Sequence, residues 1–198
     1  MKQLFLVPAL LAALALPAMA DKLSLDEISA YFSGFKTAQS SFSQVNADGS
    51  KSGGMIFIRR PGRARFEYAD TDALVLAGGG QVAIFDPKSN TPPEQFPLKR
   101  TPLNLILADR IDLGRARMVI GHDGDNTATT VTAQDPDHPE YGTIRLTFTP
   151  NPVELRQWVI TDGGGGQTTV VLTGLTKGGD FPPSYFSIPG EIDKRNGK

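Results

Sequence analysis

The side chains best able to do chemistry in this chain are its two histidines, and neither has the neighbours that catalysis or metal binding requires. His122 lies in the stretch His-Asp-Gly-Asp-Asn, and His138 lies in the polar stretch Asp-Pro-Asp-His-Pro-Glu. A zinc site needs three or four protein ligands at suitable spacings, and the chain has no cysteine. We therefore predict no metal site and no catalytic residue, and we interpret both histidines as solvated loop residues.

Two further motifs resemble ligand sites only in part. Asp123, Asp125 and Asn126 resemble a fragment of a calcium loop, but the full spacing and the terminal glutamate are missing. The glycine run 163–166 lacks the Gly-Lys-Ser/Thr of a phosphate loop, and there is no Gly-x-Ser-x-Gly nucleophile motif. We expect no cofactor, and a hydrolase acting on glycan or lipid stays open as an alternative.

One charged residue, Arg60, occupies a position that demands a partner. In an expected strand at 55–60 it shares a face with Ile56 and Ile58, and a cation on an apolar face is costly unless it is paired. A guanidinium has several donors in a fixed geometry, which suits carbonyl oxygens better than the point charge of lysine. The other interpretation is a strand-end arginine that extends into water.

The first 20 residues have the pattern of a cleaved secretory signal peptide. Lys2 is followed by an apolar run at 4–16 and by Ala-Met-Ala at 18–20, a small-x-small cleavage site. The run is shorter than the roughly 20 apolar residues that span a bilayer, although a retained anchor is the alternative. We expect residues 21–198 to form one domain that is exported to the periplasm.

Composition narrows the range of partners. The formal net charge of −1 offers no general attraction to nucleic acid or to an anionic membrane, so we expect neither as a partner. Without cysteine there is no disulfide framework, and stability must come from the core. No repeat of fixed period and no linker is visible, and we expect a monomer.

Helical periodicity is confined to two short segments. Ser24 and Glu27 form a capping-box pattern at the start of the first. Thr101 is the expected N-cap of the second, with Pro102 at its first helical position and an end near Asp109. The apolar residues at helical spacing are Leu25, Ile28, Phe32 and Phe35 in the first segment, and Leu103, Ile106 and Leu107 in the second.

The rest of the chain alternates with a period of two and is punctuated by turn residues, which predicts a long antiparallel meander. A meander of this length must curl or close to manage its edges, and the helices would then cap one mouth of an apolar interior. A short turn or helix is expected at 182–186. The expected strands are 42–45, 55–60, 63–68, 74–77, 82–85, 117–120, 127–133, 143–149, 153–161 and 167–175.

The segment 58–68, Ile-Arg-Arg-Pro-Gly-Arg-Ala-Arg-Phe-Glu-Tyr, resembles the signature of the LolA-type outer-membrane lipoprotein carrier family. Each motif is weak alone, but their order and spacing from Phe42 to Asp193 are specific. The supporting motifs are Phe42-Ser43-Gln44, Gly80-Gln81, Phe85-Asp86-Pro87, Gln157-Trp158, Asp162, Gln167-Thr168-Thr169, Phe181, Phe186 and Pro189-Gly190.

The resemblance implies a mainly β fold: a half-open, incomplete antiparallel β-barrel with a short helical lid over an apolar cavity. It also implies a periplasmic carrier that shelters the acyl chains of lipoproteins and shuttles them from the inner to the outer membrane. The implied partners are acylated lipoproteins as cargo, an inner-membrane ABC transporter that releases them, and an outer-membrane acceptor lipoprotein. A periplasmic lipid or lipoprotein sensor on the same barrel is the alternative.

The resemblance also assigns roles to residues. It places Arg60 where its guanidinium binds lid backbone carbonyls in a closed, empty state. Family members often carry a bulky apolar residue at the position of Ala64, in an expected loop at 62–65. Here Arg63 and Arg65 flank that position, so we expect them to dock on acidic partner surfaces or to be solvated. The candidates for lining the lipid cavity are Ile56, Ile58, Phe66, Tyr68, Leu74, Leu76, Val82, Ile84, Leu103, Ile106 and Leu107.

If residues 1–20 are a signal peptide, the mature chain begins at Asp21. Signal peptidase cleaves after a small residue in the small-x-small pattern, which here is Ala20. N-terminal sequencing of protein recovered from the periplasm should read Asp-Lys-Leu-Ser. Periplasmic protein that still carries residues 1–20 would contradict the prediction.

Overall fold

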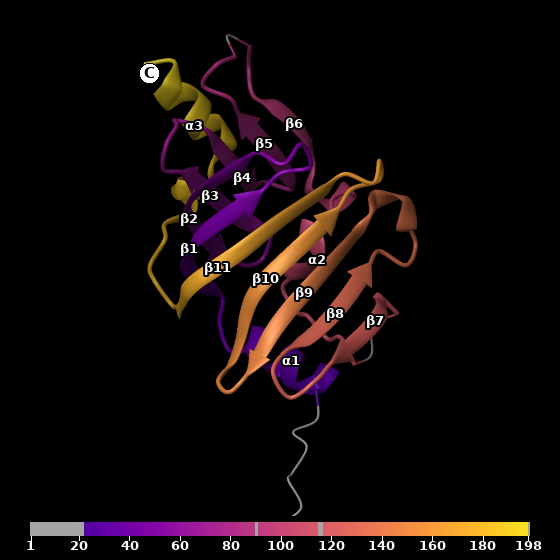
Figure 1. Ribbon diagram of the computed structural model, residues 1–198. Coiled ribbons are helices and arrows are strands. Elements are labelled where there is room, and N and C mark those ends of the chain that lie inside the picture. The colour runs from indigo at the N-terminus through magenta and orange to yellow at the C-terminus, as the bar shows by residue number, and fades with distance from the viewer. Residues whose placement is uncertain (1–21, 90, 115–116, 198) are drawn as a thin grey trace, which may run out of the picture.

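The chain folds around one large antiparallel sheet that does not close on itself (Figure 1). The computed structural model describes residues 22–89, 91–114 and 117–197, so the expected signal peptide 1–20 and cleavage before Asp21 lie outside the described residues. In those ranges the sheet has eleven strands in the order β6-β5-β4-β3-β2-β1-β11-β10-β9-β8-β7. Because β6 and β7 are its two edges, the predicted mainly β, half-open architecture is confirmed as an open sheet.

The helices and strands follow one another as a helix, six strands, a short helix, five strands and a final helix. The strands are β1 (Thr37–Val45), β2 (Lys51–Arg59), β3 (Arg63–Tyr68), β4 (Leu74–Gly78), β5 (Gln81–Phe85), β6 (Glu94–Pro97), β7 (Val119–Gly124), β8 (Thr129–Gln134), β9 (Thr143–Pro150), β10 (Val153–Thr161) and β11 (Gln167–Lys177). The α-helices are α1 (Leu25–Ser33), α2 (Leu103–Ile106) and α3 (Ile188–Arg195), and the 3-10 helices are η1 (Leu98–Arg100), η2 (Pro139–Tyr141) and η3 (Pro183–Phe186).

The pairing of β1 with β11 joins the two halves of the sheet. Strands β1 to β6 and strands β7 to β11 each form a run in which every strand pairs with the next one along the chain. Phe42 of β1 pairs with Gly54 of β2 on one side and with Leu172 of β11 on the other. Distant parts of the chain therefore share one continuous surface on each face of the sheet.

The sequence patterns missed the strand β6 and the helix α3, and they misplaced the strand β7. β6 is short and polar, so it carries no clear alternation, and α3 was not expected at all. The strand expected at 117–120 lies instead at Val119–Gly124, where His122 pairs with Val131. The turn expected at 122–126 is therefore partly strand.

The second helix also differs from the prediction at both ends. Pro102, not Thr101, is the N-cap position of α2, and the Thr101 hydroxyl instead donates to the carbonyl of Leu98 at 2.7 Å. The helix ends at Ile106 rather than near Asp109. The first helix begins as predicted, because Ser24 and Glu27 form a complete capping box.

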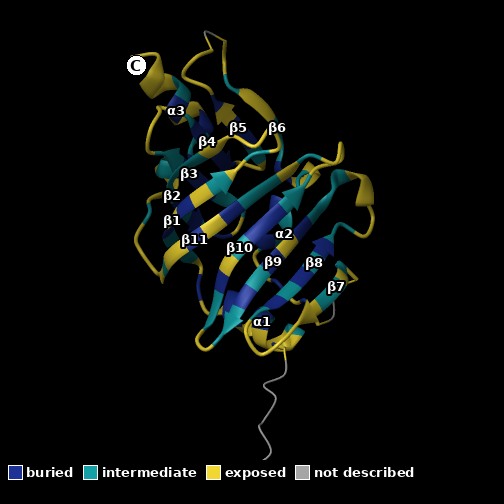
Figure 2. Cartoon of the chain, viewed as in Figure 1, coloured by how far each residue is buried: buried dark blue, intermediate teal, exposed yellow. Residues whose placement is uncertain are grey.

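The inner face of the sheet is covered by α1 and by the segment 98–113, which carries α2; we call these two pieces together the lid. Ile28 and Phe32 of α1 and Leu103 and Leu107 of the second piece are buried against inner-face residues. Figure 2 shows buried residues recurring along β9 and β10 in front of α2, with α1 at the lower end of these strands. The helices were expected to cap one mouth of an apolar interior; in the structure they cover the inner face of the open sheet.

The outer face of β3, β4 and β5 is covered by η3 and α3, which corrects part of the predicted cavity. Leu74 and Leu76 pack with Phe186 and Ile188 under this C-terminal segment, on the face opposite the lid. Ile84 points toward the lid side, because it pairs with Val75, but it is 37% exposed at the margin. Leu74 and Leu76 were assigned to the cavity because alternation alone cannot tell which of two apolar faces is which.

Arg65 is also buried on the outer face, so the expectation that it docks on a partner is wrong. Its Nε donates to Glu67 Oε1 at 2.7 Å and its Nη1 to Glu191 Oε2 at 3.1 Å. Its guanidinium lies 4.6 Å from the ring centre of Tyr185. Arg195, four residues further along α3, donates to the other oxygen of Glu191 at 2.9 Å, so the carboxylate joins α3 to β3 through Arg65 while Arg195 pairs with it within the helix.

His122 is not a solvated loop residue, although His138 is. The imidazole Nε2 of His122 lies 2.8 Å from the carbonyl of Leu23, and the Leu23 amide donates to the buried Thr129 hydroxyl at 2.8 Å. These contacts hold the segment before α1 against β7 and β8. His138 is exposed and pairs with Glu140 at 3.0 Å.

No helix in the described ranges has the length and apolar character needed to cross a membrane.

Replacing Glu191 with glutamine should loosen α3 and lower the melting temperature. Burial by itself raises the pKa of Glu191, but hydrogen bonds from Arg195 and Arg65 outweigh it and lower the pKa below the ordinary 4.5. The carboxylate therefore stabilises the fold above about pH 4.5, and this contribution is lost as the pH falls through the lowered value. We expect Glu191→Gln to cost about 2 kcal/mol at pH 7, which is about 4–8 °C in Tm for a chain of this size.

The measurement is thermal unfolding of both proteins between pH 3 and pH 7. The gap in Tm should shrink as the pH approaches 3. Glu154→Gln is the matched control, because Glu154 pairs with a half-exposed Arg156 at 2.9 Å, and such surface pairs contribute little. A Glu191→Gln protein with the wild-type Tm at pH 7 would show that the ion pairs do not hold α3.

Candidate functional site

The apolar inner face under the lid is the candidate site. It brings together Ile56 and Ile58 of β2, Phe66 of β3 and Val82 of β5 with the lid residues, while Tyr68 packs against this set in a half-buried position. Of the predicted cavity residues, the structure places Ile56, Ile58, Phe66, Tyr68, Val82, Leu103, Ile106 and Leu107 in this one cluster. Their lipid-binding role stays a prediction.

The largest inner-face side chains come from strands to which the sequence analysis assigned no site residue. Phe148 of β9 and Trp158 of β10 are almost completely buried. Tyr31 and Phe32 of α1 meet Phe148 edge to face, with ring centres 5.7 and 5.8 Å apart. Edge-to-face ring contacts add modestly to area burial, so Phe148 is the main aromatic platform beneath α1. Alternation in 143–149 and 153–161 was the available signal, but it does not say which helix covers these strands.

Arg60 lies at the point where α1 meets the sheet. Its Nη2 donates to the backbone carbonyls of Phe32 and Phe35, at the C-terminal end of α1. Its guanidinium carbon lies 4.9 Å from the ring centre of Phe35 and 5.9 Å from that of Phe32. Carbonyls at a helix C-terminus lack partners within the helix and carry partial negative charge. A buried cation here gives them a hydrogen-bond donor and a positive charge. The expected contact between Arg60 and lid carbonyls is present.

The burial and charge of Arg60 also favour its contact with the lid. The side chain is only 5% exposed, and burial lowers its pKa, an effect that the carboxylate of Asp109 opposes. An arginine guanidinium stays protonated at any physiological pH. The buried charge therefore depends on lid carbonyls and aromatic rings for the solvation that water would otherwise provide.

The turn after β2 holds both pieces of the lid. The Arg60 amide donates to the carbonyl of Lys36, just after α1, at 2.8 Å, and the Gly62 amide donates to the carbonyl of Leu107, just after α2, at 2.8 Å. Lys36 Nζ also pairs with Asp109 across the seam at 2.6 Å. A polar cleft of about 660 Å³ lies along this seam, with Arg60 at its wall. Two lid pieces are thus joined by a few polar contacts around one turn.

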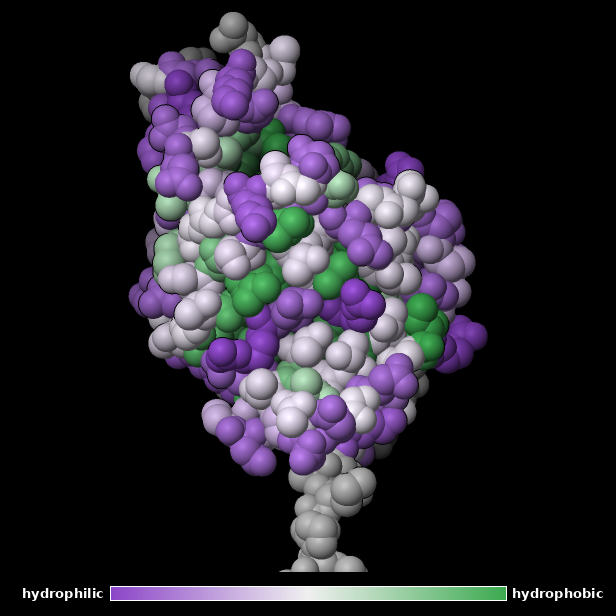
Figure 3. Space-filling view, in the orientation of Figure 1, coloured by the Kyte–Doolittle hydropathy of each residue, from purple (hydrophilic) through white to green (hydrophobic). Residues whose placement is uncertain are grey.

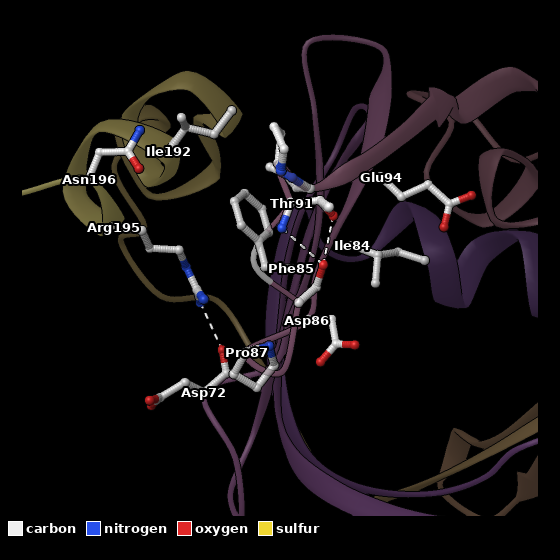
Figure 4. Close-up of a pocket in the computed structure, with 13 residues that line it drawn as sticks. Asp72, Ile84, Phe85, Asp86, Pro87, Thr91, Glu94, Ile192, Arg195 and Asn196 are labelled. Carbon is white, nitrogen blue, oxygen red and sulfur yellow. Dashed lines mark hydrogen bonds between the residues drawn. The ribbon is translucent and has the colours of Figure 1, made fainter.

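A second cleft, of about 880 Å³, lies on the other side of the molecule between α3 and the segment after β5 (Figure 4). Arg195 crosses it to donate to the carbonyl of Asp72 at 2.8 Å, and its guanidinium lies 4.9 Å from the ring centre of Phe85. Most of its walls are polar side chains and prolines. It is separate from the inner-face cluster and offers no apolar chamber for acyl chains.

The outer face of the sheet carries apolar residues in small groups among polar ones (Figure 3). In the described ranges the exposed large apolar side chains are Val45, Ile84, Ile120 and Val171. Most of the apolar surface that β1, β2, β9, β10 and β11 bury faces the lid instead.

Comparison with known proteins assigns the chain to a family. The sequence profile described as outer membrane lipoprotein carrier protein LolA matches residues 33–189. The chain belongs to the LolA family. The residues of this LolA-family chain that carried the resemblance, including 58–68, lie almost entirely within the matched range.

Two relatives of this LolA-family chain are similar over most of their length. An outer-membrane lipoprotein carrier protein of Chromobacterium violaceum is 28% identical over 188 residues, which cover 91% of this chain and 89% of the relative. One of Azotobacter vinelandii is 24% identical over 185 residues, covering 87% and 86%. A crystal structure of a LolA superfamily protein from Nitrosomonas europaea, 10% identical, covers 83% of this chain and 98% of that chain with a TM-score of 0.43.

The structure corrects the prediction for Ala64, the position at which family members often carry a bulky apolar residue. Ala64 does not lie in a loop; β3 begins at Arg63, and Ala64 is completely buried, paired with Ile58 and Ala77. A larger side chain would have to fit between these strands and the lid. Arg63 is half-exposed opposite Arg59 at the end of the hairpin, and its role in docking stays a prediction.

If the lid opens over the apolar inner face, the purified protein should bind a polarity-sensitive dye, and Arg60→Leu should bind more of it. Removing the guanidinium deletes its bonds to the carbonyls of Phe32 and Phe35, which favours the open lid. The measurement is dye fluorescence titrated against protein, with circular dichroism to confirm folding.

Arg59→Leu is the matched control for the dye experiment. Arg59 is the chain neighbour of Arg60, but its guanidinium donates to the carbonyl of Phe181 in the segment before η3, away from the lid. It should bind dye as the wild type does. A folded wild-type protein that binds no dye would argue for a permanently filled interior. So would an Arg60→Leu protein that binds no more dye than the wild type.

Proposed function

We propose that this protein is a periplasmic carrier that shelters the acyl chains of lipoproteins and shuttles them from the inner to the outer membrane. One observation carries the proposal: an apolar inner face is covered by a helical lid, and a single buried arginine, Arg60, binds the carbonyls at the end of its first helix. Membership of a family of lipoprotein carriers supports it.

The physics of acyl chains explains why such a carrier is needed. Burial of each methylene group is worth about 0.8 kcal/mol. Several long chains exposed to water would therefore cost tens of kcal/mol by the same increment, and free passage across an aqueous compartment would be negligible. A carrier must offer a comparable apolar surface and still release its cargo, so the surface cannot be both deep and permanently open.

In the proposed cycle, the lid allows both the binding of acyl chains and their release. In the empty protein, Phe32 and its neighbours on α1 fill the space over Phe148 and Trp158, and Arg60 holds the end of α1. Incoming acyl chains replace these aromatic contacts and break the Arg60 bonds. Two charge-assisted bonds at about 1.5–3 kcal/mol each are comparable with the roughly 5.5 kcal/mol that turns a 1:99 equilibrium into 99:1.

The proposed partners follow from the two ends of the route. An inner-membrane ABC transporter would release the lipoprotein to this chain, and an outer-membrane acceptor lipoprotein would receive it. Closure of the lid over its own aromatic residues favours release, because the empty state regains the Arg60 bonds. The half-exposed Arg63 is the candidate for contact with an acidic surface of either partner.

Tagged wild-type protein recovered from the periplasm without detergent should carry acylated peptide, and Arg60→Leu should carry several-fold more. Loss of the guanidinium weakens the closed state, and leucine adds apolar surface to the interior. Arg60→Lys should be intermediate, because the charge stays but the fixed donor geometry is lost. The measurement is pull-down followed by mass analysis of the bound lipoprotein, with the rate of delivery to outer membranes.

Arg59→Leu again serves as the matched control and should carry cargo at the wild-type level. Wild-type protein that never carries acylated peptide would refute the carrier function. A folded Arg60→Leu protein that carries normal amounts and delivers at the normal rate would leave the carrier function standing and remove Arg60 from its role as latch.

A further inference from the structure

Two hydrogen-bond donors are buried without partners where the lid meets the sheet. In the described ranges, the buried side-chain atoms that lack a partner are Tyr31 Oη, Ser52 Oγ and Arg60 Nε. Tyr31 is 6% exposed and Arg60 is 5% exposed. Both border the ring of Phe35, whose centre lies 5.6 Å from that of Tyr31 and 4.9 Å from the guanidinium of Arg60. Ser52 is half-buried at the other end of β2 and is a separate matter.

The hydroxyl of Tyr31 is buried without a hydrogen-bond partner. The ring alone makes the edge-to-face contacts with Phe32, Phe35 and Phe148. A buried hydroxyl without a partner has a real free-energy cost, and native proteins pair nearly all such groups. The hydroxyl is therefore best explained by a partner that is present in another state of the protein.

The hydroxyl of Tyr31 has no acceptor within hydrogen-bond distance. The backbone amide of Leu155 acts on the phenol oxygen and opposes the rise of the Tyr31 pKa, but it can only donate. The Glu154 carboxylate also raises this pKa, but it accepts from Arg156 at 2.9 Å and not from the phenol. The ammonium of Lys177 lies 4.0 Å from the ring centre and also only donates. Burial raises the pKa of Tyr31, so the phenol keeps its proton. The free Nε–H of Arg60 is likewise a donor.

A ligand that satisfies these groups must bring acceptor oxygens into an apolar interior. Free water-soluble anions carry no apolar portion, and hydrocarbon carries no acceptor. An acylated lipoprotein terminus has both, because its chains are joined through ester and amide bonds whose carbonyl oxygens only accept. The two unpaired donors of the lid thus match the chemical group at the head of the acyl chains.

We propose that Tyr31, with Arg60 Nε as a second donor, binds the ester or amide carbonyls at which acyl chains join the cargo. The inference rests on the carrier function proposed above and adds the chemical group that is recognised. The carrier would select acylated cargo over plain hydrocarbon, and it would hold the acyl head group near the seam of the lid.

The test pairs one atom of the protein with one group of the ligand. The ligands are a synthetic triacylated cysteinyl peptide and an analogue of equal chain length with ether and alkylamine links in place of its carbonyls. Tyr31→Phe should weaken binding of the ester peptide about 3- to 10-fold, the value of one hydrogen bond. Its affinity for the analogue should stay within about twofold of wild type, and its Tm should be unchanged or slightly higher.

Tyr185→Phe is the control variant, since it removes a hydroxyl that donates to Glu67 at 2.9 Å on the outer face. It should keep the wild-type preference for the ester peptide. Wild-type protein should itself prefer that peptide by a similar factor, a measurement that needs no variant to fold. If Tyr31→Phe lost affinity equally for both ligands, Tyr31 would act only through packing, and the inference would be wrong. If it lost affinity for neither ligand, the inference would also be wrong. Wild-type protein that binds neither ligand would refute the carrier function itself.

Discussion

An open sheet has to cover its apolar inner face and the apolar part of its outer face, and the rest of this structure depends on how it does so. The pairing of β1 with β11 joins eleven strands into one surface but leaves β6 and β7 as unpaired edges. The sheet cannot bury its faces by closing, so helices must do it. The lid covers the inner face and α3 covers part of the outer face.

The two covers are attached by different physics. α3 is held by Arg65, Glu191 and Arg195, a network in which each charge has a charged partner and the buried carboxylate accepts from two arginines. The end of α1 is held by Arg60, whose hydrogen bonds go to neutral carbonyls and whose charge lies over aromatic rings, with Asp109 as the carboxylate that favours it. Breaking the first network strands buried charges that are bonded to each other, whereas opening the lid removes two neutral carbonyls from Arg60, which other oxygen acceptors can replace. The inner cover is therefore the one suited to move.

The interior under the lid is filled by the protein's own aromatic side chains, and this bears on how a carrier can release cargo. Phe32, Phe148 and Trp158 are buried in one cluster, and protein interiors are close-packed. Acyl chains would have to displace contacts of similar strength, so net binding would be a small difference between large terms.

The sequence by itself determined the antiparallel meander, the capped first helix and the need for Arg60 to find a partner, because these follow from local periodicity and from the cost of an unpaired cation. Only the tertiary structure decided which apolar face each strand presents to the lid. Leu74 and Leu76 have the same alternation as Val82, yet they lie on the opposite face. Arg65 has the pattern of a surface residue, yet it is buried, because α3 returns from the far end of the chain with Glu191 to cover it. Such pairings join residues more than a hundred positions apart, and no local pattern records which distant segment will complete a half-covered surface.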